Sequence, residues 1–125
     1  DDAFRDWENL AEVVFEPGSR LARIGTYAFT NTALERFTAP KSLREIGNGA
    51  FMNCASLREA RLNEGLETIW SWDSDDGAFQ DSGLQEVILP STLRVLPRQT
   101  FSNCWCLKRV EVAEGCRLGV QYCLP

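Results

Sequence analysis

Histidine is absent from this 125-residue chain, and lysine is scarce, with only Lys41 and Lys108. Without histidine the chain has no Ser-His-Asp or Cys-His catalytic arrangement, no mixed Cys/His zinc site and no histidine pH switch. A paired carboxylate site, a glycine-rich phosphate loop and a nucleophile elbow are missing as well. We therefore expect no enzymatic activity, no cofactor and no metal.

Long apolar runs and an excess of basic charge are also missing. No stretch approaches the roughly 18 consecutive apolar residues of a membrane-spanning helix. The start, Asp1–Phe4, lacks the basic and apolar character of a signal peptide. The net charge is −5, with acids and bases interspersed, whereas nucleic-acid-binding proteins usually carry a basic stripe. We expect no membrane insertion and no nucleic-acid partner.

The sequence does contain a repeat. A phenylalanine, usually preceded by alanine, is followed two residues later by Asn or Asp, and soon afterwards by a leucine that opens a Leu-x-x-apolar-x-apolar stretch. The phenylalanines are spaced 25, 22, 28 and 22 residues apart and are Phe4, Phe29, Phe51, Phe79 and Phe101. Repeats of this length are typical of solenoids, in which each unit packs mainly on its neighbours. Solenoids present surfaces rather than pockets, which favours binding over catalysis.

Two sets of apolar residues recur from unit to unit and predict two short strands in each. The first set is Leu10/Val13/Phe15, Leu34/Phe37/Ala39, Leu57/Ala60/Leu62, Leu84/Val87/Leu89 and Leu107/Val110/Val112. The second set is Leu21/Ile24, Leu43/Ile46, Leu66/Ile69 and Leu93/Leu96. Partial alternation and β-branched residues indicate strands, and Pro- or Gly-containing turns separate the sets. Stacking predicts two parallel sheets around a Leu/Ile/Phe core, without an amphipathic helix.

A column of short polar residues follows the phenylalanines. Its members are Asp6, Asn31, Asn53, Asp81 and Asn103. We interpret these side chains as bonding backbone groups in buried or half-buried turns, so Asn53→Ala should cost more stability than Asn48→Ala. The next position holds Trp7, Thr32, Cys54, Ser82 and Cys104. Because free cysteine commonly behaves as a small buried apolar residue, Cys54 and Cys104 are interpreted as structural.

The string Leu-x-x-Ile-Gly-x-x-Ala-Phe-x-Asn-Cys-x-x-Leu at Leu43–Leu57 resembles the BspA-type (Treponema-type) leucine-rich repeat. The resemblance covers nearly the whole chain as about five units and weakens after Leu118, where the tail is either a cap or a cut repeat. It implies a mainly β solenoid with short parallel strands on two faces and little or no helix. It also implies protein binding without enzymatic activity, in a surface-exposed, secreted or intracellular protein.

The domain organisation and the compartment follow less directly. We expect one domain over residues 1–125, as a piece or short version of a longer array, because Phe4 already belongs to a repeat. Cell-surface or secreted location follows from the resemblance alone. The odd number of five cysteines favours an intracellular location if the thiols are free. The compartment therefore stays open.

Exposed positions between the strand anchors form two columns across neighbouring strands. One column is Val14, Thr38, Arg61, Ile88 and Glu111, and the other is Glu12, Arg36, Glu59, Glu86 and Arg109. Parallel strands lie about 4.8 Å apart, so the members of a column are immediate neighbours. One interpretation is a protein-binding face with Val14, Ile88 and Arg61 as contacts. The other is a solvated face whose charges form cross-strand ion pairs.

An insertion lengthens the third unit, because nine residues rather than four lead from Ile69 to Ala78. It contains Trp70 and Trp72, which either anchor a partner or fold back over the solenoid edge. The acidic stretch Asp73–Gly77 is a weaker candidate for calcium, since it lacks the ligand spacing and late Glu of an EF-hand loop.

Trp105 and the C-terminal cysteines leave further alternatives open. Trp105 is either a partner contact or a cover for the place of a next repeat. Cys116 and Cys123 either form a disulfide or are free. A zinc site that combines them with Cys104 and Cys106 lacks the usual C-x₂-C spacing.

The leading hypothesis from the sequence is a protein–protein interaction module that binds another protein through its strand face or its insertion. The alternative is a structural subunit or spacer, docked in a larger assembly or cell-surface protein. An exposed apolar patch would favour either over an inert spacer. Neither hypothesis identifies the partner.

The repeat register makes Phe51 an interior residue. Replacing it by alanine should lower the free energy of unfolding by about 3–5 kcal/mol, because a large buried ring is lost and a cavity remains. Urea unfolding of both chains measures this difference. A loss below about 1 kcal/mol would contradict the register.

Overall fold

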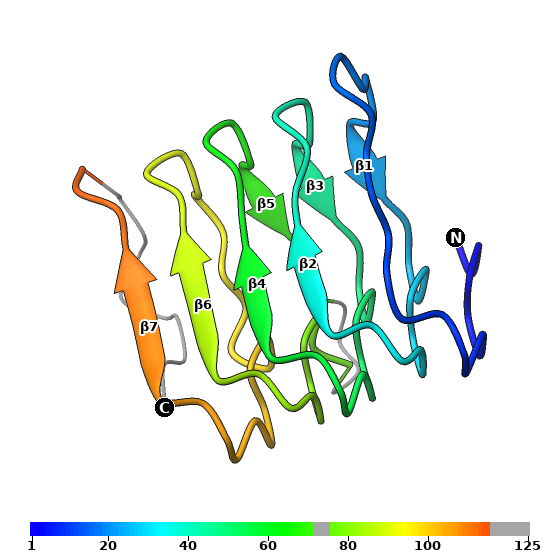
Figure 1. Ribbon diagram of the computed structural model, residues 1–125. Helices are drawn as coiled ribbons and strands as arrows, with labels where there is room; N and C mark the ends of the chain where they lie inside the picture. Colours follow the sequence, from blue (N-terminus) through cyan, green and yellow to red (C-terminus); the bar gives the residue numbers. More distant parts are fainter. Residues whose placement is uncertain (72–75, 116–125) are drawn as a thin grey trace.

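The structure, a computed structural model, describes residues 1–71 and 76–115 of the chain. The chain coils through successive turns that contribute strands to two parallel sheets (Figure 1). One sheet has the order β2 (Arg36–Thr38), β4 (Glu59–Arg61), β6 (Glu86–Leu89) and β7 (Arg109–Val112). The other has the order β1 (Arg23–Ile24), β3 (Glu45–Ile46) and β5 (Thr68–Ile69).

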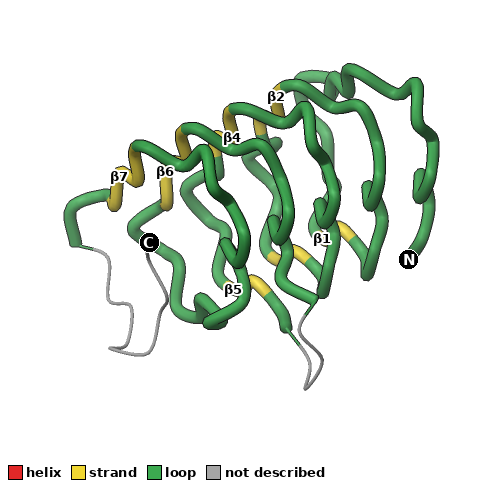
Figure 2. Tube along the Cα trace, turned by 90° about the horizontal axis from the view of Figure 1, so that it is seen from below, coloured by secondary structure: helices red, strands yellow, loops and turns green. Residues whose placement is uncertain are grey.

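The two sheets run along different sides of the coil, and loops and turns connect them (Figure 2). The described residues contain no helix. We call the outward side of β2-β4-β6-β7 the main face, and the outward side of β1-β3-β5 the second face. The predicted architecture, a mainly β solenoid with parallel strands on two faces, is therefore confirmed.

Apolar residues alternate inward along these strands and meet in register. In the larger sheet Phe37 aligns with Ala60, and Ala60 with Val87. In the smaller sheet Ile24 aligns with Ile46, and all of these residues are buried. Each solenoid turn therefore buries its strands against the next turn, so apolar burial rather than strand length holds these two- to four-residue strands together.

The repeated phenylalanines form a stack through the core. Neighbouring ring centroids lie 5.3 Å apart for Phe4–Phe29 and Phe29–Phe51, 5.0 Å for Phe51–Phe79 and 5.9 Å for Phe79–Phe101. The rings are within 14° of parallel in every pair. Each such pair is worth about 0.5–1.5 kcal/mol beyond the burial of its area. Phe51 and Phe79 are fully buried at the centre of the stack.

Two of the predicted strands do not form ladders. The Leu10–Phe15 segment packs against the core, but its backbone reaches the β2 turn through one hydrogen bond, from Glu35 N to Ala11 O at 3.3 Å. The apolar pattern determines which side chains point inward, but it does not determine whether the backbone forms a hydrogen-bonded ladder with the neighbouring strand. Leu93–Leu96 contributes only an isolated bridge between Val95 and Thr68.

Pro97 explains why the smaller sheet ends at β5. Trp70 N donates to Ile46 O at 2.8 Å, as Gly47 N does to Ile24 O at 2.7 Å. The bridge between Val95 and Thr68 places Pro97 at the corresponding position of the next turn. Proline has no backbone N–H, so the ladder cannot continue there.

The recurrence of Asn or Asp two residues after each repeated phenylalanine has a different physical reason from the one that the sequence suggested. All five residues are exposed and have φ between 57° and 63°. Asn and Asp tolerate this left-handed region better than other residues with a side chain. The interpretation of these side chains as partners for buried backbone groups is therefore wrong. Asn48, in contrast, is fully buried and donates from Nδ2 to Tyr27 Oη at 3.4 Å.

Substitutions at Asn53 test the backbone explanation. Asn53→Ala should cost about 1 kcal/mol of stability, because a residue with a Cβ but no short polar group is disfavoured at positive φ. Asn53→Gly should cost less, since glycine adopts this conformation without a steric penalty. Urea unfolding measures both. If glycine costs as much as alanine, the lost side-chain interactions rather than φ explain the column.

Asn48→Ala should cost more than Asn53→Ala, which reverses the order expected from the sequence. It removes a buried amide and leaves the groups around it without that partner, at a cost of about 1–3 kcal/mol. The same unfolding measurements decide the order. Equal stabilities of the Asn48→Ala and Asn53→Ala variants would contradict a structural role for the buried amide of Asn48.

Candidate functional site

The register of the larger sheet places the predicted surface residues side by side on the main face. Arg36 aligns with Glu59, Glu59 with Glu86, and Glu86 with Arg109. The second column aligns in the same way and consists of Thr38, Arg61, Ile88 and Glu111. All of these side chains are exposed except Glu59, which is half-buried. Ile88, with 36% of its surface exposed, is the apolar member of the aligned columns.

Charges on the main face pair along strands rather than across them. Arg61 Nε donates to Glu59 Oε1, and Arg109 Nη2 forms an ion pair with Glu111 Oε1. The expected cross-strand pairs are therefore wrong for these arginines, because the i and i+2 residues of one strand share a face. The hydrogen bond and charge of Glu59 raise the pKa of Arg61 above its ordinary value.

Arg36 and Glu86 on the main face differ from Arg61 and Arg109 in their pairing. Within the described residues neither Arg36 nor Glu86 forms an ion pair within 4 Å. Glu86 is instead the register neighbour of Glu59, a residue of like charge. Like charges directly opposite are unfavourable in a sheet.

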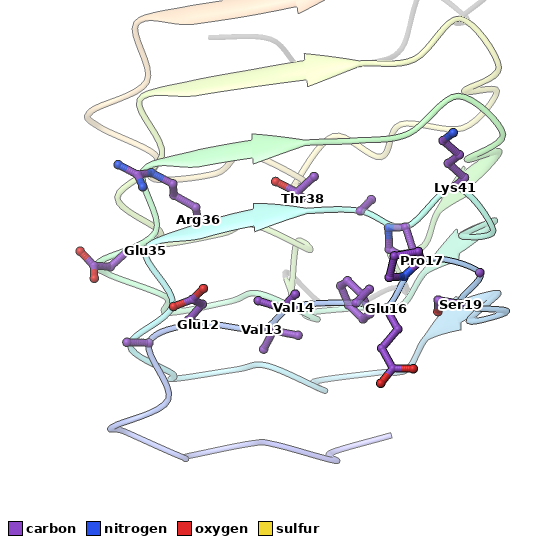
Figure 3. Close-up of a pocket in the computed structure, with 15 residues that line it drawn as sticks. Glu12, Val13, Val14, Glu16, Pro17, Ser19, Glu35, Arg36, Thr38 and Lys41 are labelled. Carbon is purple, nitrogen blue, oxygen red and sulfur yellow. The ribbon is translucent and has the colours of Figure 1, made fainter.

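The N-terminal end of the main face has a depression between two turns. Val14 and Glu12 line one side, and Arg36, Thr38 and Lys41 line the other (Figure 3). Val14 is 77% exposed. Val14 lines the same depression as Thr38, its neighbour in the predicted column, although its segment does not form a ladder with β2.

The three described tryptophans, Trp7, Trp70 and Trp105, do not join the main-face columns. Trp70 is 43% exposed and lies on the second face, where its Nε1 donates to Glu45 Oε1 at 2.8 Å. Trp105, 86% exposed, lies in the turn before β7. Trp7 is also exposed, although the sequence placed it in a small-residue column. Trp72 and residues 73–75 of the calcium candidate Asp73–Gly77 lie outside the described residues.

A polar cluster at the end of the second face was not predicted. The hydroxyl of Tyr27 donates to Asp76 Oδ2, and the guanidinium carbon of Arg5 lies 4.9 Å from the centre of the Tyr27 ring. The ring covers Gly49, where an added Cβ would lie 2.5 Å from Tyr27 Cε1. The hydrogen bond to Asp76 raises the pKa of Tyr27. Tyr27 and Asp76 are 49 residues apart, and no local signal pairs them.

Cys54 and Cys104 are buried, as the sequence predicts. Their thiols donate to the carbonyl oxygens of Phe29 and Phe79, each at 3.0 Å. Burial raises the pKa of both thiols. Cys106 is free and exposed, whereas Cys116 and Cys123 lie outside the described residues. Among the residues that are described, no group of three or more acidic or cysteine side chains could hold a metal ion.

Comparison with known proteins identifies the class. The family model of the BspA type leucine rich repeat region matches six copies within residues 1–108. The chain therefore belongs to this family of leucine-rich repeat proteins, as the sequence motif indicated. No curated protein matches the sequence. The described part of the chain contains no apolar helix of membrane-spanning length.

Two solved structures share the fold. A leucine-rich repeat protein from Bacteroides ovatus ATCC 8483 matches with a TM-score of 0.63 and 24% identity over 78% of this chain. A leucine rich cell surface protein from Faecalibacterium prausnitzii A2-165 matches with a TM-score of 0.53 and 30% identity over 84% of this chain. The matches cover only 24% and 33% of those two chains.

The thiols should differ in reactivity with iodoacetamide. Cys106 should react in the native chain, while Cys54 and Cys104 should react only after unfolding, because burial withholds the thiolate that is the nucleophile. Peptide mass mapping before and after urea treatment locates the label. Equal labelling of all three in the native chain would contradict the buried geometry.

Proposed function

We propose that this chain is a protein–protein interaction module and that the main face is its binding surface. The observation that carries the proposal is the alignment of exposed side chains across β2, β4, β6 and β7. Leucine-rich repeat solenoids build extended binding surfaces from such repeated strands. Here the surface combines an exposed Ile88 with Arg36 and Glu86, which form no ion pair within 4 Å in the described part of the chain.

The composition of the main face supports a polar, reversible contact. Two of its arginines, Arg61 and Arg109, pair with glutamates along β4 and β7, and exposed pairs of this kind contribute at most about 1 kcal/mol to stability. Their arrangement is therefore better suited to orienting a partner than to stabilising the fold. Charge complementarity at an interface mainly sets association rate and specificity.

A structural role is the second candidate, and the exposed aromatic residues favour it. Trp7 lies in the first turn and Trp105 in the turn before β7, and both expose more than half of their surface. Exposed tryptophans are costly unless another surface covers them. As a spacer in a longer array or a larger assembly, the chain would use these residues in permanent, mainly apolar contacts.

The double variant Arg61→Glu, Ile88→Glu tests the main face. Both side chains are exposed, so folding should be retained, while a partner on this face should bind at least about tenfold more weakly, as loss of a hot-spot contact implies. The matched control is Arg94→Glu, Val95→Glu, which makes the same charge change at exposed positions outside the main face. Affinity capture with mass spectrometry first identifies partners of the native chain, and titration then compares the variants.

Loss of a partner in the main-face variant but not in the control supports the module. Retention in both variants excludes the main face as the binding surface. A partner that is lost only after Trp7→Ala or Trp105→Ala, and that binds with little salt dependence, supports the structural role instead.

A further inference from the structure

We infer that the second face carries a saccharide-binding site for a pyranose ring, built on Trp70 and flanked by Arg23 and Glu45. This site is separate from the main face and does not depend on the proposed function. It occupies a small depression that Arg23, Thr26, Glu45, Gly47, Asn48 and Trp70 line. The depression lies at the ends of β1, β3 and β5, where the chain leaves the sheet.

Trp70 and Gly47 occupy equivalent positions in neighbouring turns. Trp70 follows β5 directly and stands in register with Gly47, because its N–H donates to Ile46 O as Gly47 N–H donates to Ile24 O. Gly47 has no side chain, and an added Cβ there would lie 2.7 Å from Gly25 C and Thr26 N. The first two turns therefore approach closely at Gly47, and Trp70 of the next turn lines the same depression.

Glu45 fixes the orientation of the indole. Trp70 Nε1 donates to Glu45 Oε1 at 2.8 Å, yet Trp70 remains 43% exposed. With its N–H satisfied, the accessible part of the side chain is apolar and rich in π electrons. The C–H groups of a pyranose ring carry partial positive charge and pack favourably on the negative face of such a ring. An immobilised aromatic ring loses little conformational entropy when a ligand stacks on it.

Arg23 and Glu45 both line the depression. They are register partners in β1 and β3, where opposite charges normally pair. Within residues 1–71 and 76–115, however, no ion pair within 4 Å joins them. Glu45 binds Trp70, and Arg23 makes only a long contact of 3.9 Å with Asp1. A donor-only guanidinium and an acceptor-only carboxylate therefore flank one small space.

Vicinal hydroxyl groups match this arrangement. A hydroxyl both donates and accepts, so one sugar hydroxyl can accept from Arg23 while its neighbour donates to Glu45. Hydrogen bonds to charged groups are about twice as strong as neutral ones. An aromatic platform with two flanking charges of opposite sign thus selects a polyol ring over a purely apolar or singly charged ligand.

A second layer of hydrogen bonds supports the site. Asn48, which lines the depression and is fully buried, donates to Tyr27 Oη, and Tyr27 donates to Asp76. Tyr27 adopts φ of 56°, a conformation that is rare for a bulky residue. Backbone strain of this kind persists where surrounding contacts hold it, often beside functional sites. Tyr27 is a positioning residue behind the depression rather than a contact.

Saturation-transfer NMR and calorimetry of the native chain test the inference. The probes are glucose, galactose, mannose, N-acetylglucosamine, glucuronic acid and their β-linked disaccharides. At least one should bind with a Kd on the order of 1–10 mM or tighter, as expected for a shallow site that covers one ring face. The strongest transfer should fall on ring C–H protons of one sugar face. A glycoprotein with and without glycosidase treatment then shows whether the natural source is free or protein-attached.

Variants locate the site. Trp70→Ala should weaken binding at least about tenfold, as should Arg23→Gln and Glu45→Gln. The Glu45→Gln variant keeps a side-chain oxygen that can accept the hydrogen bond from Trp70 Nε1, so the indole should keep its position. If Trp70→Ala does not fold, Glu45→Gln shows whether saccharide binding depends on this depression. Trp105→Ala is the matched control, because it removes an exposed tryptophan elsewhere, and it should bind normally. Thermal melting confirms folding of each variant.

Two results would overturn the inference: no binding of any saccharide to the native chain, or binding that Trp70→Ala and Glu45→Gln leave unchanged. The main-face variant Arg61→Glu, Ile88→Glu should keep saccharide binding. Failure of this inference and failure of the proposed function are therefore distinguishable.

Discussion

The parallel stacking of one turn on the next is the constraint on which the rest of the structure depends. Strands of two to four residues would not persist alone, because a short strand gains few hydrogen bonds for the backbone entropy that it loses. Here every strand except β7 has a buried apolar residue aligned with an apolar residue of its neighbour, and Val110 of β7 is half-buried. The phenylalanine stack joins the turns through the core. The same register that buries Phe37, Ala60 and Val87 places their flanking residues outward. Core and surface columns are thus two consequences of one alignment.

The alternation that follows from this register explains why much of the main face could be predicted. Once Ala60 and Val87 are assigned inward, Glu59, Arg61, Glu86 and Ile88 must point outward. The sequence pattern could not show which charges would pair. The side-chain rotamer of each arginine determines whether it reaches a glutamate on its own strand or one on the neighbouring strand. It also missed Pro97, whose missing N–H matters only once the bridge at Val95 is known.

The Asn/Asp column and the second face show a further limit of the sequence. A recurring Asn indicates a special turn, but buried hydrogen bonding and positive φ predict the same residue types. Only the observed φ of 60° at Asn53, with its exposed side chain, separates them. The contact between Tyr27 and Asp76 spans 49 residues and an insertion, so no periodicity contains it. Contacts that occur once in a repeat protein leave no repeated trace in its sequence.

The two surfaces differ accordingly in how they can vary. Main-face residues add little to stability, so substitution there can change a partner without loss of the fold. The second face depends on residues that depart from the repeat: Trp70 stands where Gly25 and Gly47 stand in the preceding turns, and the hydroxyl of Tyr27 donates to Asp76 of the insertion. Departures from a repeat cost stability unless something compensates them, and natural proteins accept such costs mainly at functional sites. The concentration of these departures around one depression is the physical reason to seek a ligand there.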